Sequence, residues 1–255
     1  MVEPLFRANL SQQPEIGEVV SLDGAEAKHA ISVRRMRIGE AIQITDGQGL
    51  RVRGEVTSIA ERSLALVVKS TERESLPSTR FVLVQALAKG DRDELAIQAA
   101  TELGAWAIWP WQAERSVSRW DAAKAVKGVD RWQAIVTEAA KQSLRVFEPR
   151  VTTPVTTKEL ASRVGEFDQV LVLDPTASVG LGSVNLDSVG SGPRVPGVGE
   201  VAIVVGPEGG ISETELNQLE AAGAKRVRLG HEILRTSTAG VAAISALQAR
   251  LGAWD

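Results

Sequence analysis

The chain has 255 residues, of which 44% are hydrophobic and 24% charged, and its formal net charge is −3. This composition is typical of a globular protein and excludes wholesale disorder and collagen-like repeats. The absence of cysteine excludes disulfides, Cys-ligated zinc and a cysteine nucleophile, and the two histidines, His29 and His231, lie far apart. No apolar run is long enough to cross a membrane, and the N-terminal residues lack a secretory signal. We therefore expect a cytoplasmic protein with no membrane or metal partner.

Residues 1–74 are predicted to form short β-strands joined by polar turns, with one short helix over 25–36. The alternation of polar and apolar residues is typical of half-buried strands. Strands at this spacing predict a small β-barrel that ends in the polar stretch 71–78. The predicted strands are 19–20, 41–45, 51–56 and 63–68.

In residues 75–255, short apolar strands alternate with helices, which predicts an α/β domain. The strands are continuous apolar runs, typical of a parallel sheet that helices cover on both faces. The predicted strands are 81–86, 107–110, 170–173, 201–205 and 226–229, and the predicted helices are 91–103, 130–143, 212–222 and 238–251.

Two of these helices begin with the spacing of a capping box, Asp91 with Glu94 and Ser212 with Glu215. Gly104 and Gly223 are well placed to end the same two helices. The stretch 178–199 is rich in glycine, serine, valine and proline and has no helical period. It is predicted to be a flexible surface loop between two strands.

The connection 205–212 (VGPEGGIS) follows an apolar strand and leads into a helix. Glycines allow the backbone to approach a ligand closely, and loops at the carboxyl ends of parallel strands are where α/β sheets bind ligands. The alternative is a tight turn without a ligand. The loop lacks the Gly-Lys-Ser/Thr of a nucleotide-binding P-loop.

A second strand-to-helix connection, 229–240, contains Arg235 followed by the hydroxyl residues 236–238. The hydroxyls can cap the helix that follows, and Arg235 can orient an anionic or polar substrate. His231 and Glu232 form a pair whose type and spacing favour a solvated loop over acid–base catalysis.

Local clusters of basic residues stand out in this acidic chain. Residues 28–37 contain four lysines and arginines and no acid, and further basic groups occur at 89–92, at Arg115 and at Arg145. Such side chains are what phosphate contacts require. The alternative is an ordinary solvated surface.

Taken in order, these segments resemble the bacterial small-subunit ribosomal RNA methyltransferases that methylate uridine at N3, a family of the SPOUT, or α/β-knot, class. The resemblance implies a PUA-like RNA-binding β-barrel at 1–74 and a trefoil-knotted α/β SPOUT methyltransferase domain at 75–255. It also implies S-adenosyl-L-methionine as methyl donor, 16S ribosomal RNA in the small ribosomal subunit as partner, and a homodimer with its active site near the subunit interface. The matching stretches are 29–37, 88–92, 100–104, 114–117, 131–132, 138–143, 205–210, 229–230 and 234–236.

With this function, individual residues have expected roles. Arg235 is the expected catalytic residue, because a cation near the uridine carbonyls favours loss of the N3 proton. The residues expected to bind the cofactor are Leu173, Val205, Gly206, Pro207, Glu208, Gly209, Leu229, Gly230, Ile233, Leu234 and Thr236. The residues expected to bind RNA are Arg7, Arg34, Arg35, Arg37, Lys89, Arg92, Arg115 and Arg145.

The chain departs from the family pattern at two positions and in one loop. Glu232 stands where members often carry arginine, and Ser237 stands where they often carry glutamate, so no side-chain role is carried over there. The stretch 178–199 looks like an insertion. Two alternatives stay open: a SPOUT enzyme that methylates another RNA position, such as a ribose 2′-oxygen, and a non-catalytic RNA-binding protein of ribosome assembly.

Overall fold

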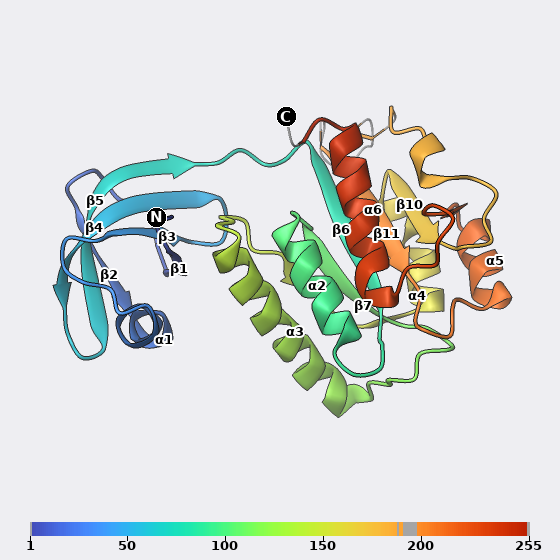
Figure 1. Cartoon of the computed structure of the whole chain (residues 1–255), viewed down its shortest axis with the longest axis horizontal. Coiled ribbons are helices and arrows are strands. Elements are labelled where there is room, and N and C mark those ends of the chain that lie inside the picture. The colour runs from blue at the N-terminus through green and yellow to red at the C-terminus, as the bar shows by residue number, and fades with distance from the viewer. Residues whose placement is uncertain (1, 188, 191–197, 254–255) are drawn as a thin grey trace. The chain divides into compact units, whose positions relative to one another are not determined.

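The computed structural model describes residues 2–187, 189–190 and 198–253 (Figure 1). The chain divides into two compact units. The first consists of Met1–Leu76 with Ala140–Glu148, and the second of Pro77–Ala139 with Pro149–Asp255. The domain boundary expected after residue 74 stays a prediction.

Within its described residues, the first unit contains one curled sheet in the order β1-β3-β4-β5-β2 (Figure 1). Its apolar face buries side chains such as Phe6, Ile42 and Leu66 in one core. The sequence predicts these strands except β1, which is three residues long and pairs in parallel with β3. The strands are β1 (Leu5–Arg7), β2 (Val19–Asp23), β3 (Ala41–Thr45), β4 (Leu50–Ile59) and β5 (Ser63–Arg73).

The helix predicted over 25–36 is shorter than expected. Helix α1 (Gly24–Lys28) continues into one π-helical turn, His29–Val33, and stops there. Arg35 has a φ of 54°, a left-handed conformation that cannot continue a right-handed helix. Met36, the next residue, is buried in the core of the sheet.

The segment Ala140–Glu148 packs on the curled sheet although it lies far from it in the sequence. The amide of Gly49 donates to the carbonyl of Val146 at 3.0 Å. Arg51 donates to the carbonyl of Leu144 at 3.0 Å. The buried Lys141 forms an ion pair of 2.6 Å with Glu26 of α1. The first unit is therefore completed by a distant stretch of chain.

Among its described residues, the second unit holds a parallel sheet in the order β12-β10-β11-β6-β7-β8, with β9 also paired to β7. The strands are β6 (Thr79–Ala86), β7 (Ala107–Gln112), β8 (Arg150–Val151), β9 (Val155–Thr156), β10 (Gln169–Leu173), β11 (Gly199–Val205) and β12 (Lys225–Val227). The helices are α2 (Arg92–Glu102), α3 (Ala122–Gln142), α4 (Thr157–Ser162), α5 (Glu213–Ala221) and α6 (Thr236–Arg250).

Helices cover both faces of this sheet, as its apolar strands predict. Leu83 and Ile203 point into one core with residues of α2, α3 and α6. Val84 and Val204, one residue further along each strand, point into the opposite core with residues of α4 and α5. None of the helices in the described part of the chain combines the length and the apolar character that crossing a bilayer requires.

One predicted capping box forms and the other does not. The Ser212 hydroxyl and the Glu215 carboxylate cap α5 reciprocally. Asp91 makes no side-chain cap at α2. Asp93 instead accepts from the amides of Ala88 at 3.0 Å and Glu94 at 2.9 Å, while burial raises the pKa of its carboxyl.

Other differences concern element length and the stretch 178–199. Helix α3 begins at Ala122 rather than at residue 130, and the short α4, β8 and β9 are not predicted. Residues 178–187 lie between β10 and β11 and are mostly exposed, as a surface loop predicts, but Leu181 and Val184 are buried and anchor the segment. Arg250 of α6 donates to their carbonyls at 3.1 and 2.8 Å. Residues 188 and 191–197 lie outside the described residues.

Helix α6 lies so close to the sheet that Gly240 has no room for a side chain. A Cβ there would lie 2.7 Å from Leu83 Cδ1 and 3.1 Å from Val205 Cγ2. Overpacking outweighs the gain in helix propensity, so we expect Gly240→Ala to lower the free energy of unfolding by about 1–2 kcal/mol. Urea unfolding measures this change. Gly165→Ala is the matched control, because its Cβ would meet nothing within 4 Å; an equal loss in both variants would contradict the prediction.

Candidate functional site

A pocket of about 470 Å³ lies at the carboxyl ends of β10, β11 and β12. Two connections form most of its wall: Val205–Ile211, which leads from β11 toward α5, and Arg228–Thr236, which leads from β12 into α6. The two glycine-containing connections singled out in the sequence therefore line one pocket, as expected for parallel strands that end at one edge.

The pocket brings together nearly all residues expected to bind the cofactor, together with Arg235 and Arg92. Those of the expected set that line it are Leu173, Val205, Gly206, Pro207, Glu208, Leu229, Gly230, Ile233, Leu234 and Thr236. Further lining residues that were not in the expected set are Asp174, Pro175, Gly210, Ile211, Arg228, His231, Glu232 and Ala239.

Gly209 is the expected cofactor residue that does not line the pocket. A Cβ on Gly209 would lie 3.2 Å from Cβ of Arg115, and Arg115 donates to the Gly209 carbonyl at 3.1 Å. Gly206 does line the pocket, and its Cβ would lie 2.6 Å from Cγ1 of Ile211. Close packing inside the loop therefore requires glycine at 206.

Thr236 links the two connections. It is buried at the first turn of α6, and its hydroxyl donates to the carbonyl of Gly206 at 2.8 Å. The expected capping of α6 by hydroxyls does not occur: the N-cap is Arg235, whose side chain makes no capping hydrogen bond, and Thr238 donates to the Arg235 carbonyl at 3.1 Å. The hydroxyls of Thr236 and Thr238 therefore donate to carbonyls instead of accepting from the first amides of the helix.

Glu208 is held in the loop by groups that follow β6. Its Oε1 accepts from Arg92 at 2.6 Å and from the Lys89 amide at 3.1 Å. Burial raises the pKa of the Glu208 carboxyl, but these hydrogen bonds lower it by more, so its pKa lies below its usual value. Glu208 is therefore ionised at neutral pH, and its charge is paired with that of Arg92, which lines the same pocket.

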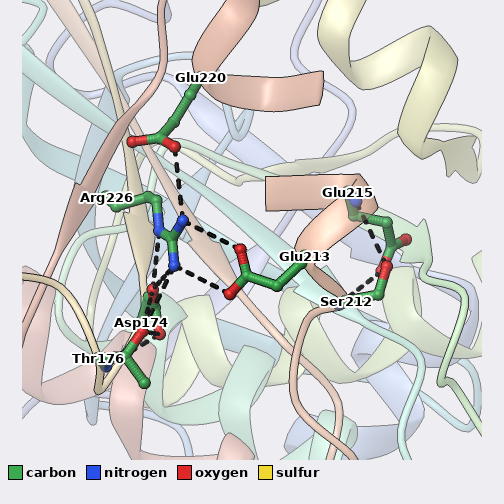
Figure 2. A network of polar contacts seen from close by, with 7 residues as sticks. All are labelled: Asp174, Thr176, Ser212, Glu213, Glu215, Glu220 and Arg226. Carbon is green, nitrogen blue, oxygen red and sulfur yellow. Dashed lines mark hydrogen bonds and ion pairs between the residues drawn. The ribbon is translucent and has the colours of Figure 1, made fainter. Parts of the chain in front are cut away.

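Asp174 follows β10 directly and is buried in a network of polar contacts (Figure 2). Arg226 of β12 donates to its Oδ2 at 2.8 Å, and Thr176 donates to its Oδ1 from both its amide and its hydroxyl. Arg226 also pairs with Glu213 at 3.3 Å and Glu220 at 3.5 Å, so it joins this pocket wall to α5. Because its oxygens are engaged, Asp174 shapes the wall and is not a free base.

The connection into α6 leaves several side chains exposed beside the pocket. Arg235, His231 and Glu232 are exposed, and the apolar Ile233 keeps 81% of its surface in water. Arg235 therefore places a positive charge on the pocket wall that a substrate can reach. Within the described residues, no group of three or more His, Asp or Glu side chains is arranged to hold a metal ion.

The residues expected to bind RNA are spread over both units. In the second unit, Lys89 and Arg115 are exposed and Arg92 pairs with Glu208. In the first unit, Arg34, Arg35 and Arg37 are all exposed around the buried Met36. Arg7 pairs with Glu148. Arg145 is half-buried, and burial lowers the pKa of its guanidinium to about 10, which keeps it charged at neutral pH.

The Asp174 network makes stability depend on pH. Burial raises the pKa of Asp174, but the hydrogen bonds from Thr176 and Arg226 lower it by more. Its stabilising contribution is therefore present above the ordinary carboxyl pKa of about 4 and is lost as the pH falls through the folded-state value. We expect Asp174→Asn to lower the free energy of unfolding by about 2 kcal/mol at pH 7.

At pH 3 the loss of stability caused by Asp174→Asn should be smaller, because the unfolded wild-type chain then binds a proton at this carboxyl and the wild type loses part of its advantage. Urea unfolding at both pH values measures it. Asp187→Asn, at an exposed carboxyl, is the control and should change stability by less than about 0.5 kcal/mol. If Asp174→Asn lowered the free energy of unfolding equally at pH 3 and pH 7, the charge of Asp174 would not be the source of its stabilising contribution.

Sequence comparisons match both parts of the chain to known families. The profile of an RNA methyltransferase domain matches residues 74–248, and that of an RNA methyltransferase PUA domain matches residues 22–69. A protein of Mycobacterium bovis named ribosomal RNA small subunit methyltransferase E is 40% identical over 248 residues, which cover 95% of this chain and 90% of that protein. The protein of the same name from Bacillus subtilis is 36% identical and covers 92% of each chain.

Two solved structures share the fold over nearly the whole chain. The ribosomal RNA small subunit methyltransferase E of Neisseria gonorrhoeae, bound to S-adenosyl methionine, is 30% identical with a TM-score of 0.83, covering 98% of both chains. A putative methyltransferase of Legionella pneumophila, in complex with the same cofactor, is 26% identical with a TM-score of 0.85 and equal coverage. The expected fold class, an α/β SPOUT domain with a PUA-like N-terminal part, is confirmed, whereas the trefoil knot stays a prediction. The chain belongs to the family of ribosomal RNA small subunit methyltransferases E.

Proposed function

We propose that this chain is an S-adenosyl-L-methionine-dependent methyltransferase that methylates N3 of a uridine in 16S ribosomal RNA of the small subunit. The observation that carries the proposal is the single pocket formed by the connections after β11 and β12. Two solved structures that share this fold over 98% of the chain hold bound S-adenosyl methionine. A ribosomal substrate would place the protein in the cytoplasm.

The pocket suits the chemistry of this methyl donor. Its volume lies within the roughly 300–1,000 Å³ of typical cofactor sites. Leu173, Val205 and Leu234 supply apolar walls for an adenine ring, and the glycine-containing loops offer backbone groups for its edge. Glu232 supplies negative charge for the cationic sulfonium and ammonium groups, whereas the charge of Glu208 is already paired with Arg92.

The main task of the protein is positioning, because the methyl group arrives already activated. When bound, S-adenosylmethionine would supply a methyl group from its sulfonium sulfur, which would be left as a neutral thioether, and the N3 proton of the uridine would pass to water. Arg235 can stabilise the uridine anion, whose charge spreads over the carbonyl oxygens beside N3. His231 and Glu232 line the same pocket but are exposed, and the proposal gives them no proton-transfer role.

The rest of the proposal concerns partners. The exposed arginines at 34, 35 and 37 offer charges for RNA phosphates. Lys89, Arg92 and Arg115 lie in or beside the connections around the pocket, where Arg92 and Arg115 also hold the 207–210 loop. We further propose a homodimer, because the exposed Ile233 and Leu234 form an apolar surface at the pocket wall that a second copy would cover.

Methyl transfer to small ribosomal subunits tests the function. Wild-type protein with labelled S-adenosylmethionine should yield N3-methyluridine on nucleoside analysis of the 16S RNA. Arg235→Gln should lower the single-turnover rate at saturating RNA by about 10²-fold, because one stabilising donor is lost in the transition state. Calorimetry should show unchanged affinity for S-adenosylmethionine.

Other results would favour the alternatives. A methylated ribose in place of N3-methyluridine would indicate a SPOUT enzyme with another target. Absence of both methyl transfer and S-adenosylmethionine binding would indicate a non-catalytic RNA-binding protein. A normal rate in Arg235→Gln would exclude Arg235 from catalysis.

The salt dependence of RNA binding tests the role of the arginine cluster. Each of Arg34→Gln and Arg37→Gln should weaken binding and reduce the slope of log affinity against log salt by about one unit, since one phosphate contact is lost. Arg62→Gln removes an exposed arginine of the same unit outside the cluster and should leave the slope unchanged. Filter binding over a range of salt concentrations gives these slopes; equal slopes in all variants would make the cluster an ordinary solvated surface.

A further inference from the structure

Gln85 is a polar side chain buried within the parallel sheet. It lies near the carboxyl end of β6, between the apolar Val84 and Ala86, and it is fully buried. Its Oε1 has no hydrogen-bond partner among the described residues. Burial of an unpartnered oxygen costs free energy, so packing alone does not account for glutamine at this position.

The amide nitrogen of Gln85 determines the direction of a short chain of hydrogen bonds. It lies 3.2 Å from the carbonyl of Ala86 and 2.9 Å from the hydroxyl of Thr236. A carbonyl can only accept, so the amide must turn its nitrogen toward both groups, and both of its hydrogens are used. The Thr236 hydroxyl accepts from Gln85 and gives its own hydrogen to the Gly206 carbonyl at 2.8 Å.

This chain of bonds connects three parts of the second unit. Gln85 belongs to β6, Gly206 begins the connection after β11, and Thr236 ends the connection after β12. Gly206 and Thr236 both line the pocket, whereas Gln85 is not among the lining residues. Because Gln85 and Thr236 are buried, water does not compete for their bonds, and the spacing of the two connections is held from inside the sheet.

We propose that Gln85 is a positioning residue for the methyl-donor pocket. Acting through Thr236, it holds the Gly206 carbonyl and thereby sets the separation of the two loops that receive the ligand. The identity of that ligand rests on the proposed function, but the restraint on the loops does not. Gln85 does not touch the ligand and takes no part in the chemical step.

Calorimetric titration with S-adenosylmethionine tests this role in the full-length protein. Gln85→Leu should raise the Kd about five- to tenfold, the loss expected for one buried hydrogen bond. The midpoint of thermal unfolding should stay within about 2 °C of wild type, because the substitution also removes the unpartnered oxygen. A residue with a merely structural role would show the reverse, a lower midpoint with a normal Kd.

Variants of Thr236 and a distant control sharpen the test. Thr236→Val should raise the Kd about tenfold, and Thr236→Ser, which keeps the hydroxyl, should restore it. The double variant Gln85→Leu/Thr236→Val should be no worse than Thr236→Val, because both residues act in one chain of bonds. Thr101→Val removes a buried hydroxyl that donates within α2 to Ile97 at 2.7 Å, and it should leave the Kd unchanged.

Amide hydrogen exchange in the ligand-free protein separates this proposal from the proposed function. Gln85→Leu should speed exchange in the 206–211 segment and leave β10 and β7 unchanged. If the wild type fails to bind S-adenosylmethionine, the proposed function fails and the exchange result still decides the role of Gln85. Normal exchange in 206–211, or faster exchange throughout the sheet, would overturn the proposal.

Discussion

The parallel alignment of β10, β11 and β12 is the constraint on which the rest of the second unit depends. It brings the carboxyl ends of three strands to one edge, so the connections after β11 and β12 must share one pocket. A parallel sheet also has to be covered on both faces, which places α6 against β6 and β11 without room for a side chain at Gly240. The loops can hold a fixed separation because the elements beneath them are closely packed.

Much of the fold could be predicted, since long elements leave a clear pattern in the sequence. Strand β3 matches its predicted range of 41–45, and the box of Ser212 with Glu215 forms as expected. Short elements contain too few residues to show a periodic spacing of apolar side chains, which is why β8 and β9 were not predicted. Where three acids stand within four residues, the pattern cannot tell which takes the backbone amides, and Asp93 does so rather than Asp91.

The parts of the candidate site that depend on glycine-containing loops could be predicted. The parts that depend on hydrogen bonds between residues distant in the sequence could not. Both connections could be located because glycine after an apolar strand is a local signal. The roles of Asp174 and Gln85 depend on Arg226 and Thr236, which lie far away in the sequence. The signal that was present is a polar residue inside or directly after an apolar strand, since such a group needs a partner once it is buried.

The discontinuity of the first unit has a consequence for how the protein is made. Gly49 donates to Val146, and Glu26 pairs with Lys141, so the curled sheet lacks these partners until the chain has been synthesised through Ala140–Glu148. On the ribosome, these contacts can form only after β6, β7 and α3 have emerged, so the first unit cannot be completed before much of the second has been synthesised. A nascent chain that stalled after Leu76 would lack the partners that Ala140–Glu148 supplies to Gly49 and Glu26.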